Sequence, residues 1–122
     1  MCSAQGASQC FEDAAVLGTL LGQVQRGEQL DDILFIYESL RKPRAKEVKK
    51  QSAEVLRVFC LPNGLEQQNR DSQLTEPEPS QGYPVILMDP VFRRWLWGYN
   101  ANTEALHAWE KYLHDKTSKN AN

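Results

Sequence analysis

Apolar residues recur at intervals of three and four along most of this chain, and alternation of apolar and polar residues is absent. The three-and-four spacing predicts amphipathic helices rather than strands. The predicted fold class is therefore mainly α, with at most a trace of strand near Val85–Met88. We expect three longer helices and two or three short ones, at about residues 8–21, 30–42, 44–60, 65–74, 90–97 and 102–114.

The first predicted helix is apolar on nearly every face. One face carries Phe11 and Leu21, and the others carry Val16, Leu17 and Leu20. A helix of this kind is normally buried on several sides. We therefore expect it to be covered by self-association or by a partner chain, or else to unfold in part.

The later predicted helices carry one apolar stripe each. In the third helix the stripe is Ala45, Val48, Ala53, Leu56 and Phe59, and in the last helix it is Leu106, Trp109 and Leu113. Beyond residue 114 we expect the polar tail to fray.

Turn and cap residues mark the predicted ends of these helices. Asp31 or Asp32 is expected to cap the second helix, and Pro43 to end or kink it at Lys42. Asp89 is expected to cap the helix that Gly98 ends. Between them, the Pro-rich and Glu-rich stretch at 76–82 is typical of an exposed, mobile linker. The predicted organisation is one domain over 1–122, with segments at 1–22, 23–74, 75–90 and 91–122.

Composition narrows the class of protein. A chain of 122 residues suits one modest domain, and a formal charge of -2 with a pI near 5.7 gives no reason to expect binding to nucleic acid or an anionic membrane. Three cysteines without a CxxC pair or a secretory leader indicate neither a disulfide framework nor a zinc site. No apolar stretch reaches the roughly 18–20 residues that span a bilayer. We expect a soluble, cytoplasmic protein.

Side chains with catalytic or ligand-binding potential mostly have an ordinary explanation. His107 and His114 lie seven residues apart, roughly 10 Å along a helix, which is too far to share a metal. Glu12 and Asp13 are adjacent on a helix and point in different directions, so they do not form an acid/base pair. A basic run interleaved with acids is typical of a solvated helix face; its members are Arg41, Lys42, Arg44, Lys46, Lys49 and Lys50. No catalytic residue and no metal site is predicted.

The turn before the first helix is the strongest candidate for a binding site. Gly6 and Ala7 leave the backbone open to a planar ligand, and Ser8 can cap the first turn of the helix. Unpaired N–H groups and the positive end of the helix dipole would then stabilise a partly negative oxygen. Many helices begin in this way without binding anything, so the pattern alone leaves both interpretations open.

Four motifs follow one another in order along the chain. They are Ala4–Ser8 with Glu12–Leu17, Tyr37–Arg44, Leu61–Gly64 with Glu66–Gln67 and Arg70–Asp71, and Trp95–Ala101. In this order they resemble the C-terminal part of FAD-dependent aromatic monooxygenases, and the fungal salicylate hydroxylase-like group most of all. The resemblance implies that Gln5, Gly6, Ala7 and Ser8 contact the flavin of FAD. It also implies NAD(P)H as co-substrate, O₂, and hydroxylation of a small aromatic substrate.

The family's first half is missing from this sequence. No GxGxxG unit, Gly-Asp motif or substrate sheet is present. The resemblance therefore implies the helical C-terminal portion of such an enzyme without its Rossmann-type FAD-binding half, truncated or split, inactive alone and at best a weak binder of FAD. The alternative is a non-catalytic helical interaction module or accessory subunit that docks on a partner chain.

Overall fold

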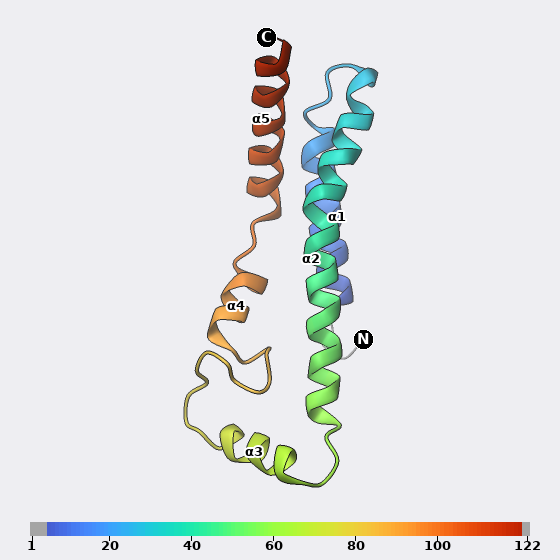
Figure 1. Cartoon of the computed structure of the whole chain (residues 1–122). Helices are drawn as coiled ribbons and strands as arrows, with labels where there is room; N and C mark the ends of the chain where they lie inside the picture. Colours follow the sequence, from blue (N-terminus) through green and yellow to red (C-terminus); the bar gives the residue numbers. More distant parts are fainter. Residues whose placement is uncertain (1–4, 121–122) are drawn as a thin grey trace. The chain divides into compact units, whose positions relative to one another are not determined.

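The chain is helical throughout its described part. The computed structural model describes residues 5–120, which form helices and turns and no strand (Figure 1). The helices are α1 (Gly6–Leu21), α2 (Leu30–Phe59), α3 (Leu65–Leu74), α4 (Pro90–Trp97) and α5 (Ala101–Asn120), with a 3₁₀ turn, η1 (Gly27–Gln29), before α2. The predicted fold class is confirmed.

These helices belong to two compact units. Residues 6–46 and 100–120 form the first, here called the α1–α5 unit, and Gln5 with residues 47–99 forms the second, the α3–α4 unit. Helix α2 contributes its first half to one unit and its second half to the other. The finer division of the chain at residues 22, 74 and 90 stays a prediction.

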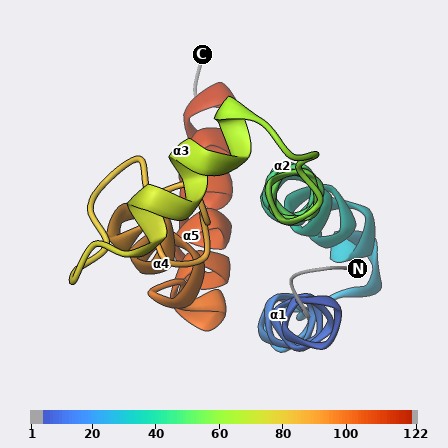
Figure 2. The ribbon, with the colours of Figure 1, turned by 90° about the horizontal axis from the view of Figure 1, so that it is seen from below.

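The core of the α1–α5 unit joins three helices. In Figures 1 and 2, α1 lies beside the first half of α2, and α1 also packs against α5. The core side chains are almost fully buried: Val16, Leu20, Ile33, Ile36, Ala105 and Trp109. The chain therefore covers one face of α1 itself, whereas Phe11 stays 75% exposed on another face. On α5 only Trp109 of the predicted stripe is buried; it shares the core with Ala105, whereas Leu106 and Leu113 are 38% and 41% exposed.

Several helix ends differ from the sequence prediction. Helix α1 begins at Gly6, so Ser8 lies inside its first turn and is not the N-cap. Because η1 leads directly into α2, Asp31 and Asp32 lie in the first turn of that helix rather than capping it. Helix α5 continues to Asn120, so the predicted fraying from residue 115 is wrong, and the last two residues lie outside the described part.

Helix α2 runs through Pro43 without a break. The predicted end at Lys42 and separate third helix are therefore wrong. Proline removes one backbone hydrogen bond and crowds the preceding turn, but Arg41 and Arg44 lie on either side of it and both bind Glu12 of α1. These tertiary contacts hold the helix together across the proline.

The second half of α2 buries a different face from the one predicted. Its buried side chains are Val48, Ser52, Val55 and Val58. Ser52 fits this apolar face because its hydroxyl donates to the carbonyl of Val48 at 2.8 Å. A count of apolar residues does not find Ser52. Of the predicted stripe only Val48 is buried, and its other four residues are exposed.

The α3–α4 unit follows its local signals closely. Helix α3 matches the predicted bounds, and the Asp89 side chain caps α4 by accepting from the backbone N–H groups of Val91 and Phe92. The linker prediction is right about exposure at 76–82 but not beyond, since Tyr83 and Val85 pack against Val58.

Within residues 5–120 no helix combines the length and the apolar character needed to cross a bilayer.

Candidate functional site

The predicted flavin-facing residues lie at the start of α1. Ala7 and Ser8 are exposed in the first turn, and Gly6 is the partly exposed first residue of the helix. Gln5 is different, because it is buried in the α3–α4 unit near Val48. A contact to a ligand from Gln5 would therefore use its backbone rather than its side chain. Ala4, also part of the motif, lies outside the described residues.

The electrostatics of this helix end suit a partly negative group. The first N–H groups of an α-helix have no partner within the helix, and the dipole places positive charge there. No acidic side chain lies in the first turn of α1 to neutralise it. Because Gly6 lacks a side chain and Ala7 has only a methyl group, a flat ligand can approach these N–H groups closely.

One turn further along, a buried arginine fixes α1 to α2. The side chain of Arg41 is only 3% exposed and binds two carboxylates of α1 at once. Its Nη1 donates to Glu12 Oε2 at 2.6 Å and its Nε to Asp13 Oδ1 at 2.6 Å, while Nη2 donates to the Gln9 side chain at 2.8 Å. A single guanidinium thus binds three polar side chains of α1, at positions 9, 12 and 13.

A second arginine completes the cluster. Arg44, 6% exposed, donates from Nε to Glu12 Oε2 at 2.6 Å and from Nη2 to Oε1 at 2.8 Å. Burial alone would raise the pKa of Glu12, but hydrogen bonds and charge from Arg44 and Arg41 outweigh it and lower that pKa. Glu12 is therefore ionised at neutral pH, and we call Glu12, Asp13, Arg41 and Arg44 the arginine–carboxylate cluster.

The sequence prediction for the two arginines was wrong. Arg41 and Arg44 are not part of a solvated face, although Lys42 is, in its i,i+4 ion pair with Glu38. Glu12 and Asp13 are predicted to point in different directions from the helix, and the one long side chain of Arg41 binds both of them. One sequence signal could have found this: Glu12 and Asp13 are the sole charged residues of α1, most of which is apolar.

The other candidate side chains carry no site. His107 and His114 are both exposed, as expected for surface histidines. No group of three possible metal ligands occurs among residues 5–120. Cys10 and Cys60 are free thiols on the surface, and Cys2 lies outside the described residues.

Sequence comparison identifies relatives of this chain. An FAD-dependent monooxygenase of Beauveria bassiana is 35% identical over 99 residues, which is 80% of this chain and 23% of the relative. A 3-amino-4-hydroxybenzoate 2-monooxygenase of Streptomyces platensis is 37% identical over 80% of this chain and 22% of the relative. The chain is related to the FAD-dependent monooxygenases. No protein-family model matches it.

The relationship to FAD-dependent monooxygenases confirms the resemblance of the four motifs. An FAD-dependent monooxygenase of Arthrinium sp is also similar, at 31% identity over 76% of this chain. The chain spans less than a quarter of the length of these relatives. Closeness to the salicylate hydroxylase-like group, truncation and the flavin contacts of Gln5–Ser8 stay predictions.

Proposed function

We propose that this chain is the flavin-facing C-terminal portion of an FAD-dependent aromatic monooxygenase. The observation that carries the proposal is the open first turn of α1, with Ala7 and Ser8 exposed and no acid beside the N–H groups. The names of the relatives support FAD as the cofactor. FAD, when bound, would supply the activation of O₂ at the expense of NAD(P)H and the transfer of one oxygen atom to an aromatic ring.

In this proposal the chain itself binds the flavin and fixes its orientation. The backbone N–H groups of Gly6 and Ala7 would donate to a carbonyl oxygen at the pyrimidine end of the flavin. The arginine–carboxylate cluster fixes α1 to α2 further along the helix, so that these donors would keep their direction without rearrangement. No side chain in this proposal acts as acid, base or nucleophile.

The same proposal limits what the chain does alone. A dinucleotide is normally held by a glycine-rich strand–turn–helix unit, which this sequence does not contain. We therefore expect the chain alone to be inactive and to bind FAD no better than weakly. The ADP half of the cofactor should add nothing to the affinity.

Flavin titration tests this proposal. Quenching of flavin fluorescence should give the same weak affinity for FAD and for lumiflavin, which lacks the ADP half. Ala7→Asp should abolish binding, because an acid in the first turn repels the flavin oxygen while it suits the helix dipole. Thr103→Asp is the matched control, since it adds the same charge to the first turn of α5.

Three results would count against the flavin contact. They are tighter binding of FAD than of lumiflavin, binding unchanged by Ala7→Asp, and no binding of either flavin at about 1 mM. A protein that stays yellow through gel filtration would contradict the weak affinity.

A second function is supported by the outer face of α1. Phe11 is 75% exposed and Leu21 43% exposed, which favours an accessory subunit or interaction module whose α1 is covered by a second copy or a partner chain in the cytoplasm. Sedimentation should then detect oligomers that Phe11→Gln converts to monomers. A wild-type monomer that ignores a hydrophobic dye would argue against this function.

A further inference from the structure

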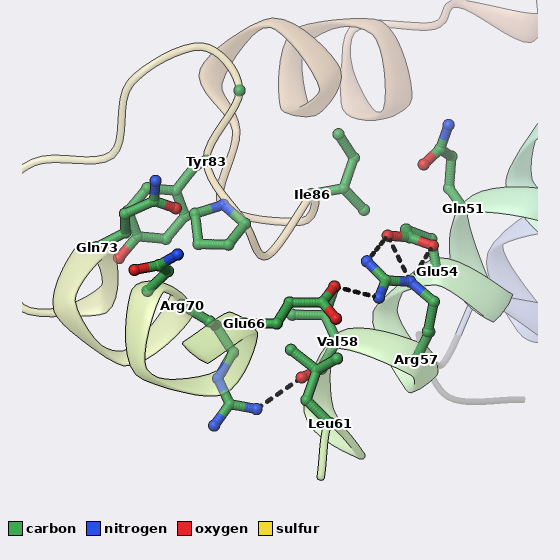
Figure 3. A pocket seen from close by; sticks show the side chains of 13 residues that line it. Gln51, Glu54, Arg57, Val58, Leu61, Glu66, Arg70, Gln73, Tyr83 and Ile86 are labelled. Atoms are coloured by element: carbon green, nitrogen blue, oxygen red, sulfur yellow. Dashed lines mark hydrogen bonds and ion pairs between the residues drawn. The ribbon is translucent and has the colours of Figure 1, made fainter. Parts of the chain in front are cut away.

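The α3–α4 unit contains a pocket that no motif of the sequence predicted. It measures about 370 Å³, within the range of small-molecule sites. Its walls come from the second half of α2, from α3 and from the loop at 82–86 (Figure 3). Three segments separated in the sequence thus meet at one place within a single compact unit.

The floor of this pocket is apolar. Tyr83 and Val58 are nearly buried and form a small cluster with Val85. Leu61, Pro84 and Ile86 complete the apolar lining. Figure 3 shows Val58 and Leu61 from α2 and the turn after it, with Tyr83 and Ile86 from the loop at 82–86, so the apolar lining comes from both segments.

The charges around the pocket neutralise one another. Arg57 donates to Glu54 and to Glu66, both at 2.7 Å, and so connects α2 with α3. Arg70 donates to Asp71 and, at 2.6 Å, to the carbonyl of Val58. Each guanidinium is already matched by carboxylates, so a charged ligand would have to break an existing pair or enter without a partner.

Two side-chain amides at the rim remain available for hydrogen bonds. Asn69 and Gln73 both line the pocket from α3. Neither side chain has a hydrogen bond to another residue within 5–120. A carboxamide offers donors and an acceptor together, and so suits a neutral polar group.

We propose that this pocket binds a small uncharged aromatic compound whose ring lies on the Tyr83–Val58 floor and whose polar group bonds to Asn69 and Gln73. We assign binding rather than catalysis to this pocket, because its two carboxylates, Glu54 and Glu66, are both held in ion pairs with Arg57. It shares no lining residue with the proposed flavin contact at Gln5–Ser8.

Three probes of similar size and different charge test this proposal. Benzamide is neutral, benzoate is an anion and benzylammonium is a cation. NMR signals of the Val58 and Ile86 methyl groups and the Tyr83 ring should shift saturably with benzamide, with a dissociation constant on the order of millimolar. Both charged probes should bind at least about fivefold more weakly, because they meet a rim whose charges are already paired.

Variants at the rim separate binding from folding. The double variant Asn69→Ala/Gln73→Ala should weaken benzamide at least about fivefold and leave toluene, which has no polar group, unaffected. Gln68→Ala is the matched control, since Gln68 is exposed on α3 and does not line the pocket. Far-UV circular dichroism checks that every variant is folded.

Each contrary result overturns the proposal. No saturable shift at about 5 mM benzamide means that the pocket binds nothing of this class. Benzoate or benzylammonium binding as tightly as benzamide means that the ion pairs open and that the ligand is charged. An unchanged benzamide affinity in the double variant means that Asn69 and Gln73 do not bond to the ligand.

Discussion

Glu12→Gln is the sharpest test of the arginine–carboxylate cluster. The change keeps the size of the side chain but removes the carboxylate that Arg41 and Arg44 share. These two guanidiniums are 3% and 6% exposed. Removing one partner of a buried ion pair typically costs about 3–5 kcal/mol. We expect a loss of about 3 kcal/mol, the low end, because Glu12 itself is 16% exposed and Asp13 still binds Arg41.

Urea unfolding followed by far-UV circular dichroism measures this loss. The matched control is Glu38→Gln, which breaks the exposed pair with Lys42 on the surface of α2 and should change the midpoint little. Equal midpoints for the two variants would refute the assignment of stability to the cluster. A changed urea dependence rather than a changed midpoint would mean that the unfolded state was altered.

The pH dependence of stability gives the same test a second readout. The pKa of Glu12 is lowered in the folded chain, because hydrogen bonds and charge from Arg44 and Arg41 outweigh the effect of burial. Its contribution to stability is therefore fully present above its usual pKa of 4.5 and is lost as the pH falls through the folded value. Glu12→Gln should remove this part of the acid dependence. An acid profile identical to that of the wild type would contradict it.

Two further substitutions test the fold. The Asp89 carboxylate accepts from three backbone N–H groups, those of Gly82, Val91 and Phe92. Asp89→Ala should therefore lower the free energy of unfolding by about 2 kcal/mol, whereas Asp89→Asn keeps an acceptor and should lose less. Equal losses in the two variants would count against the cap. Since the Phe92 N–H and the other backbone donors lower the pKa of Asp89, its contribution should be fully present above its usual value of 3.8 and should be lost as the pH falls through the lower folded value. Leu20→Ala leaves a cavity between α1 and its neighbours and should cost about 2–5 kcal/mol in urea unfolding, against far less for the half-exposed neighbour Leu21→Ala; similar losses would show that α1 packs differently.

Local chemistry was enough to predict α3 and α4. Pro62, Asn63 and Gly64 make a turn before α3, and Asp89 with Gly98 marks both ends of α4. These signals act within a few residues and depend on no distant partner. The sequence therefore predicted these elements, and the position of Gly6–Ser8 at a helix start, without knowledge of the packing.

Tertiary contacts decided what the sequence could not predict. Pro43 lies inside a helix because Arg41 and Arg44 bind the carboxylate of Glu12, which is 29 and 32 residues away from them in the sequence. The buried face of α2 contains Ser52, whose hydroxyl is satisfied within the helix and so escapes a count of apolar residues. The pocket with Tyr83 as its floor depends on three segments meeting, and no single segment carries a pattern that indicates it.

The Asp89 carboxylate also determines where this chain can change in length. By accepting from the Gly82 N–H at 2.6 Å and from the first turn of α4, it closes the intervening residues into a small ring. An added residue between Gly82 and Asp89 would displace Tyr83 and Val85 from Val58, whereas one added at 76–81 would lie in solvent. Insertions and tags should therefore be tolerated immediately before Gly82 and rejected immediately after it.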